Sequence, residues 1–128
     1  MTDNKTVWTY NGHEFSLDMD DLDELERYDK AKNAQQTYTA KQINITSEVR
    51  PLITYCEAMR VLFDTLFGEG TAEKLLGDTR KPSDYDAVYE SFNDFLYTQT
   101  KEISERRDKM LRKYLPNREQ RRAIEKAK

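Results

Sequence analysis

Alternating apolar and polar residues at the start of the chain predict a β-hairpin around Asn11-Gly12. This dipeptide suits a two-residue type I′ turn, because both central residues of that turn need positive φ. Side chains alternate between the two faces of a strand, so the aromatic residues gather on one face. A lone hairpin is marginally stable, and this face is therefore expected to pack on helices. The predicted register pairs Tyr10 with His13, Trp8 with Phe15 and Thr6 with Leu17.

A helical pattern replaces the alternation in the next segment. Asp18 or Asp20 is expected to cap this first helix, because aspartate oxygens accept hydrogen bonds from the free N–H groups at a helix start. The polar segment 33–39 is expected as a weak continuation with little to pack against. A narrow apolar stripe is predicted from residues three apart, namely Met19, Leu22, Leu25 and Tyr28.

The second helix has the strongest apolar pattern in the chain. Thr46 or Ser47 is expected to cap it, with Pro51 in its first turn and Gly68 at its end. A short helix capped by Thr71 and ended by Gly77 is expected to follow. The apolar stripe of the second helix contains Val49, Leu52, Ile53, Cys56, Met59, Leu62, Phe63, Leu66 and Phe67.

A loop over residues 78–82 leads to a third long helix, for which Ser83 and Asp86 form a candidate capping box. About 30 residues at ~1.5 Å each span ~45 Å, whereas the expected radius of gyration is ~14 Å. The helix past about Ile103 is therefore expected to project or to meet a partner. Its stripe contains Tyr85, Val88, Tyr89, Phe92, Phe95, Leu96, Ile103, Met110, Leu111 and Tyr114.

Together these elements predict an α+β fold that is mostly α, with an N-terminal β-hairpin packed on three or four helices. A chain of 128 residues fits one domain. Residues 1–115 form that predicted domain. Leu115-Pro116 breaks the long helix, and residues 116–128 form a basic C-terminal tail that is expected to hold a short helix capped by Asn117.

Composition favours a binding protein over an enzyme. Charged residues make up 35% of the chain, against a usual ~25%. No apolar run predicts a membrane span and no leader predicts secretion, so a cytoplasmic protein is expected. Cys56 is the only cysteine and His13 the only histidine, which excludes cysteine-based metal clusters and most zinc sites. Cys56 is expected in the core and His13 in the hairpin, and no catalytic residue, cofactor or metal is predicted.

Charge is segregated along the chain. Residues 1–100 carry 10 Lys/Arg and 19 Asp/Glu, whereas residues 101–128 carry 11 Lys/Arg and 5 Asp/Glu. Eight carboxylates lie in the acidic head, residues 14–29, where only Arg27 opposes them. Such runs are usually solvated helix faces. The acidic head and the basic end can also attract each other, within one chain or between two.

Two stretches carry a resemblance to a known family. They are residues 62–72, Leu-Phe-Asp-Thr-Leu-Phe-Gly-Glu-Gly-Thr-Ala, and residues 114–122, Tyr-Leu-Pro-Asn-Arg-Glu-Gln-Arg-Arg. Behind a short hairpin and an acidic helix, they resemble tail assembly chaperones of long-tailed phages of Gram-positive hosts. This resemblance implies a non-enzymatic protein of the host cytoplasm. Such a protein binds the tape measure protein, keeps its long apolar helices soluble and helps to recruit tail tube subunits.

The predicted partner-binding residues lie at the end of the long helix and in the tail. They are Met110, Leu111, Tyr114, Arg118, Arg121 and Arg122, with Arg106, Arg107, Arg112 and Lys113 around them. An apolar seam rimmed by cations suits an acidic amphipathic helix, such as a segment of the tape measure protein. Alternatively, the tail folds back on the acidic head of its own chain, and a homo-oligomer is also possible.

Two other functions stand as alternatives. The acidic head would imitate DNA phosphates and inhibit a host DNA-binding protein. The basic tail would bind nucleic acid, with affinity that falls steeply as salt rises. The overall acidity of the chain and the lack of stacking aromatics in the tail argue against nucleic acid.

Overall fold

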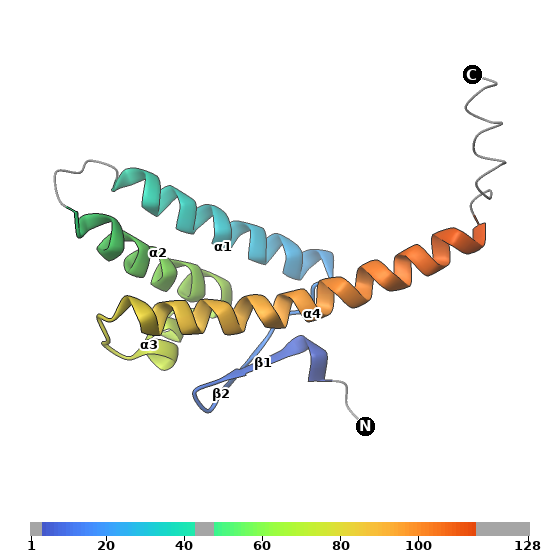
Figure 1. Ribbon diagram of the computed structural model, residues 1–128, viewed down its shortest axis with the longest axis horizontal. Coiled ribbons are helices and arrows are strands. Elements are labelled where there is room, and N and C mark those ends of the chain that lie inside the picture. The colour runs from blue at the N-terminus through green and yellow to red at the C-terminus, as the bar shows by residue number, and fades with distance from the viewer. Residues whose placement is uncertain (1–3, 43–47, 115–128) are drawn as a thin grey trace, which may run out of the picture.

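The computed structural model of the chain describes residues 4–42 and 48–114. A 3-10 turn precedes a two-stranded antiparallel sheet and four α-helices, so the fold is α+β and mostly α, as predicted (Figure 1). No helix in these two described ranges is long and apolar enough to cross a membrane. The elements are the turn (Asn4–Thr6), β1 (Val7–Tyr10), β2 (His13–Ser16), α1 (Leu22–Lys41), α2 (Arg50–Phe67), α3 (Thr71–Leu76) and α4 (Pro82–Tyr114).

The hairpin has the predicted turn and register. Trp8 lies opposite Phe15 across the sheet, with ring centroids 5.6 Å apart. Asn11 and Gly12 have φ of 52° and 78°, as a type I′ turn requires. Trp8 and Phe15 are buried together with Leu17, which confirms the predicted aromatic face.

The first helix begins later than the sequence predicts. Asp21 is its N-cap, and the Asp21 carboxylate accepts hydrogen bonds from the backbone N–H groups of Asp23 and Glu24. The prediction of Asp18 or Asp20 as the cap is therefore wrong. Asp18 instead accepts a hydrogen bond from the N–H of Asp20 within the preceding turn.

The apolar stripe of α1 is narrower than predicted. Ala31 is fully buried and Tyr28 packs against the core, but Leu22 is 76% exposed. Residues three apart rotate by about 60° at each step around a helix, so four successive positions cannot all face one core. The helix continues through its polar part to Lys41, packed along α2.

The start of α2 departs from the predicted cap. Val49 is the N-cap and makes no side-chain capping bond, while Pro51 lies in the first turn as expected. The predicted caps Thr46 and Ser47 lie outside the described residues. Gly68 ends the helix with φ of 113°, as predicted.

The first turn of α2 is exposed, and its buried residues begin at Thr54. Leu62 and Phe63 have no exposed surface, whereas Val49 and Leu52 are 59% and 52% exposed. Their predicted burial is wrong because, within the described ranges, no element covers this side of α2, where an open groove runs to the start of α4.

The predicted cap of α3 is displaced by one residue. Gly70, with φ of 93°, is the N-cap, and Thr71 is the first helical residue. The Thr71 hydroxyl donates to the carbonyl of Gly68, which tightens the turn between α2 and α3. Gly77 ends α3 as predicted.

The predicted capping box of the last helix is also wrong. Because α4 begins at Pro82, Ser83 lies inside its first turn and cannot be its N-cap. Proline suits this position, where a free N–H would have no partner. Asp86 instead accepts a 2.6 Å hydrogen bond from the Tyr55 hydroxyl of α2.

An aromatic cluster joins the hairpin to α2 and α4. The ring of Phe92 on α4 is fully buried, 5.1 Å from that of Trp8 and 5.2 Å from that of Phe63. The indole N–H of Trp8 donates to the Ser91 hydroxyl at 3.0 Å, which satisfies its one polar atom. This cluster fixes the hairpin against the middle of α4.

Beyond this cluster, Gln99 ties the entry of α1 to α4. Its side chain is almost fully buried, donates to the carbonyl of Leu17 at 2.8 Å and accepts from the N–H of Met19 at 3.0 Å. One side chain therefore satisfies two backbone groups that have left the sheet.

The last helix extends past the rest of the fold (Figure 1). Its 33 residues are about 50 Å long at ~1.5 Å each. The guanidinium of Arg106 pairs with the carboxylate of Asp20, in the turn before α1, at 2.9 Å. Residues 104–114 are all exposed. The predicted projection past Ile103 is confirmed.

Candidate functional site

An uncovered apolar surface lies at the free end of α4. We call it the distal face, and it consists of Met110, Leu111 and Tyr114, which are 52%, 40% and 77% exposed. Met110 follows Ile103 by seven residues and Tyr114 follows Met110 by four. These spacings keep the residues on one side of the helix. The distal face is therefore the continuation, into solvent, of the side that packs on the core.

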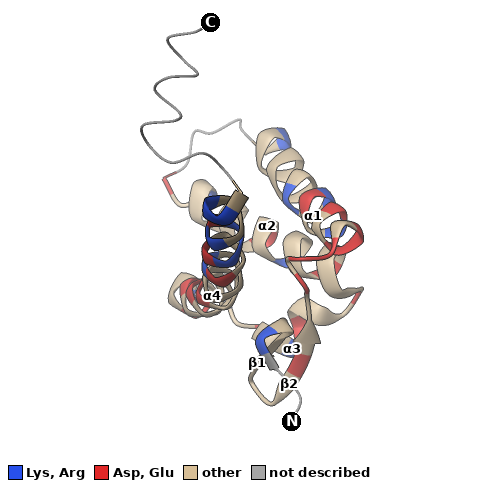
Figure 2. Cartoon of the chain, turned by 90° about the vertical axis from the view of Figure 1, so that its right-hand side faces the viewer, with Lys and Arg blue, Asp and Glu red and all other residues tan. Residues whose placement is uncertain are grey.

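Basic residues surround the distal face. Residues 104–114 contain five Lys/Arg and two Asp/Glu, and Figure 2 shows much blue at this end of α4. Arg106 was predicted as part of this rim, but its ion pair with Asp20 commits it to its own chain. Arg107 and Lys113 lie beside Met110 and Tyr114 around the helix. Arg112, also predicted in the rim, instead lines the other side of α4 with Glu105, Asp108 and Lys109.

A shallow groove lies between the acidic head and the part of α4 that precedes the distal face. It measures about 240 Å³ and runs between the entry of α1 and α4. Met19, Leu25 and Ile103 give it apolar walls, and Arg107 and Asp108 stand toward the tip of α4. The groove extends the apolar surface from one helix to two, and the sequence pattern gave no sign of it.

A second groove lies at the opposite end of the fold, between α2 and the loop that precedes α4. It measures about 590 Å³ and includes the exposed side chains of Val49 and Leu52. Arg60 crosses it, donating to the Tyr85 hydroxyl at 2.9 Å and to the carbonyl of Gly77 at 2.6 Å. The guanidinium therefore holds the loop to α2 and is already engaged.

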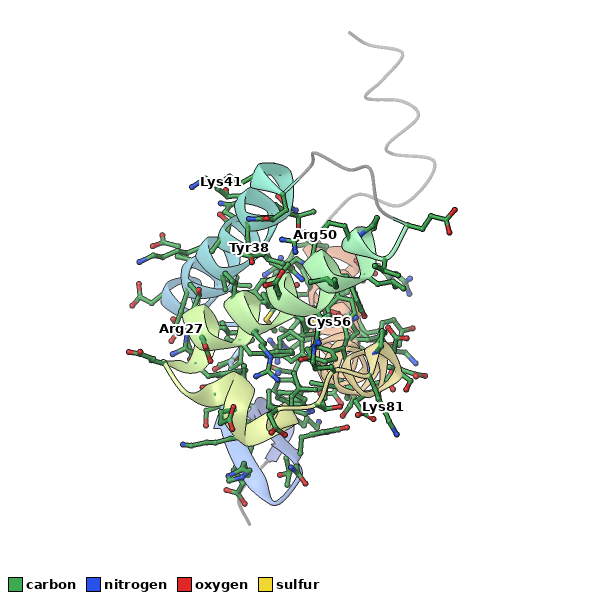
Figure 3. The ribbon with its side chains drawn as sticks, turned by 90° about the vertical axis from the view of Figure 1, so that its left-hand side faces the viewer. Arg27, Tyr38, Lys41, Arg50, Cys56 and Lys81 are labelled. Atoms are coloured by element: carbon green, nitrogen blue, oxygen red, sulfur yellow. The ribbon has the colours of Figure 1, made fainter. Side chains whose placement is uncertain are left out.

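Cys56 lines this second groove (Figure 3). Burial raises the pKa of its thiol, and the Asp86 carboxylate raises it further. A raised pKa leaves less thiolate at neutral pH, and the thiolate is the reactive form. Cys56 is half-buried at the edge of the core, close to its predicted place. Within the described ranges, no three His, Cys, Asp or Glu residues are placed to hold a metal ion.

The sequence matches a family of unknown function, DUF6673, over residues 11–125. The chain belongs to the DUF6673 family. Comparison with curated proteins and with solved structures gives no match. The region shared with other DUF6673 members includes β2, all four described α-helices and the distal face.

The predicted partner-binding residues of this DUF6673 chain fall into two groups. Met110, Leu111 and Tyr114 lie together and exposed on α4. The other three, Arg118, Arg121 and Arg122, lie outside the described residues. The anchoring roles of Arg60 and Gln99 were not predicted from the sequence. Each is a polar residue on an otherwise apolar side of its helix, and this interruption is the signal that could have indicated such a role.

Proposed function

We propose that this protein is a non-enzymatic tail assembly chaperone of a long-tailed phage that acts in the host cytoplasm. In this proposal the distal face binds an acidic amphipathic helix of the tape measure protein, and the complex helps to recruit tail tube subunits. The observation that carries the proposal is the continuation of the core-facing side of α4 into solvent at Met110 and Tyr114. The resemblance of residues 62–72 and 114–122 to such chaperones supplies the partner.

The chemistry of the distal face supports a helical partner. A helix binds in a groove through apolar anchors spaced at i, i+3, i+4 and i+7. Ile103, Met110 and Tyr114 present that spacing along one side of a rigid helix. The rim cations Arg107 and Lys113 favour a partner with carboxylates beside its apolar stripe. Because the core ends before these residues, binding there requires no rearrangement of the fold.

Co-expression with the tape measure protein of the same phage tests this proposal. The wild-type chain is expected to keep the tape measure protein soluble and to co-purify with it. Leu111→Glu combined with Tyr114→Glu is expected to abolish both effects while its thermal unfolding stays at the wild-type temperature. Arg118→Glu, Arg121→Glu and Arg122→Glu combined measure the contribution of the tail.

A matched control changes apolar residues of similar exposure elsewhere. Leu52→Glu combined with Tyr97→Glu alters two side chains that are 52% and 64% exposed and is expected to leave co-purification intact. Equal binding by the Leu111/Tyr114 variant and the wild type would rule out the distal face. Binding of nucleic acid by the wild type, lost at high salt, would favour the nucleic-acid alternative.

A further inference from the structure

The groove between the entry of α1 and α4 lies on the same side of α4 as the distal face. Ile103 lines this groove, and Met110 and Tyr114 follow Ile103 by about two and three helical turns. Arg107 also lines the groove and lies one turn before Leu111. The groove and the distal face are therefore successive parts of one side of the helix.

Two contacts with α4 hold the α1 side of the groove in place. Met19 belongs to the groove wall, and its backbone N–H donates to the side chain of Gln99 at 3.0 Å. The next residue, Asp20, forms the ion pair with Arg106 at 2.9 Å. The wall is therefore fixed within the single chain, and a partner that fills the groove does not have to order it.

The size and lining of the groove indicate one apolar side chain as its occupant. Its volume of about 240 Å³ is below the ~300–1,000 Å³ of pockets that enclose a small-molecule ligand. Met19, Leu25 and Ile103 are half-buried, so each leaves apolar surface uncovered in the groove. The Thr100 hydroxyl, on the α4 side, already donates to the carbonyl of Tyr97 at 3.2 Å. The occupant therefore does not have to supply a polar group to this hydroxyl.

We propose that this groove is the inner end of the partner site and binds one bulky apolar side chain of the partner helix. This inference rests on the proposed function, and it places that side chain two to three turns from the residues that contact Met110 and Tyr114. Arg107 and Asp108 line the groove with charges of opposite sign. Because like charges across an interface repel, they favour an apolar side chain flanked by a carboxylate and by a cation. A buried apolar anchor within a polar rim supplies much of the binding energy of an interface.

Filling the groove with a side chain of its own helix tests this inference. Thr100→Trp adds a large side chain at an exposed position that lines the groove and is expected to weaken binding about tenfold or more. Thr98→Trp is the matched control, because Thr98 is exposed on α4 and lies about 160° away around the helix. Each full-length variant is co-expressed with the wild-type chain and a tagged tape measure protein of the same phage. The ratio of the two chains that co-purify gives their relative affinity, and thermal unfolding checks that each variant is folded.

The possible outcomes separate this inference from the proposed function. If Leu111→Glu with Tyr114→Glu abolishes binding but Thr100→Trp binds like the wild type, the groove is not part of the site and the proposed function stands. If the wild type itself does not bind the tape measure protein, both are overturned. Equal losses for Thr100→Trp and Thr98→Trp would show a general effect of the bulky residue and would also overturn the role of the groove. A Thr100→Trp chain that binds normally but self-associates less than the wild type would assign the groove to a second copy instead.

Discussion

Phe63 and Phe92 occupy the centre of the aromatic cluster, and neither has any exposed surface. Their ring centroids lie 5.2 Å apart in an edge-to-face arrangement, which aromatic pairs favour. Trp8 packs on both rings, so the contact of these three side chains joins α2, α4 and the hairpin. The stability of the fold is therefore most sensitive to truncation at this point.

Phe63→Ala is expected to lower the free energy of unfolding by about 3–5 kcal/mol, because the cavity left by a buried ring cannot fully collapse. Leu22→Ala removes an apolar side chain that is 76% exposed and is expected to cost under ~0.5 kcal/mol. Urea titration of both variants measures the difference. Similar losses for the two would show that the aromatic cluster is not the centre of the core.

Tyr55 gives the fold a pH dependence at the alkaline end. Burial raises the pKa of its phenol, and the hydrogen bond it donates to Asp86 raises it further. The unfolded chain therefore loses this proton first, near pH ~10, so the free energy of unfolding falls as pH rises above that value. Below pH ~10, the contribution of Tyr55 to the free energy of unfolding is fully present.

Urea titration between neutral pH and pH ~11 measures this effect, because that pH range includes the pKa of tyrosine in the unfolded chain. Tyr55→Phe is expected to make the alkaline decline shallower, whereas Tyr97→Phe, at a 64% exposed position, is expected to leave it unchanged. Identical pH profiles for the wild type and Tyr55→Phe would remove Tyr55 as the cause.

At the scale of elements, the structure is a set of helices fastened by a few polar side chains. Gln99 holds the entry of α1 on α4, and Arg60 holds the loop before α4 on α2. Both sit where the apolar pattern alone would place a hydrocarbon side chain. Gln99 binds two backbone groups between β2 and α1, and Arg60 binds the backbone carbonyl of Gly77 at the end of α3.

Gln99→Leu is expected to lower the free energy of unfolding by about 2–4 kcal/mol, because it leaves the carbonyl of Leu17 and the N–H of Met19 unpaired. Gln36→Leu makes the same change at an exposed position of α1 and is expected to have little effect. Hydrogen exchange at Met19 provides a second measurement. A stable Gln99→Leu protein with slow exchange there would contradict this anchoring role.

Element type and order follow from the sequence, whereas contacts between elements do not. The Asn11-Gly12 turn, the helix end at Gly68 and the long helix to Tyr114 each rest on local geometry. The exposure of Leu22 and Leu52 depends on which neighbouring element covers them. Spacing within one helix carries no information about that neighbour. The same reason explains why Met110 and Tyr114 were predictable as a face but the groove beside them was not.

At the scale of the whole molecule, one half is a packed core and the other is a projecting helix with an apolar face. The turn before α1 is held to α4 by the ion pair between Asp20 and Arg106. Changes at the tip of α4 are therefore expected to alter binding and leave folding unchanged. Partner binding is thus expected at the projecting end of α4 and not at the part of α4 that packs on the core.

Site-specific photo-crosslinking tests that claim most directly. A photoreactive phenylalanine analogue replaces Tyr114 on the distal face or, as the control, the 64% exposed Tyr97 of the same helix. Each labelled chain is co-expressed with the tape measure protein and irradiated, and adduct masses separate that partner from a second copy of this chain. Tape measure adducts are expected from position 114 and none from position 97. Adducts of equal yield from both positions, or from position 97 alone, would contradict it.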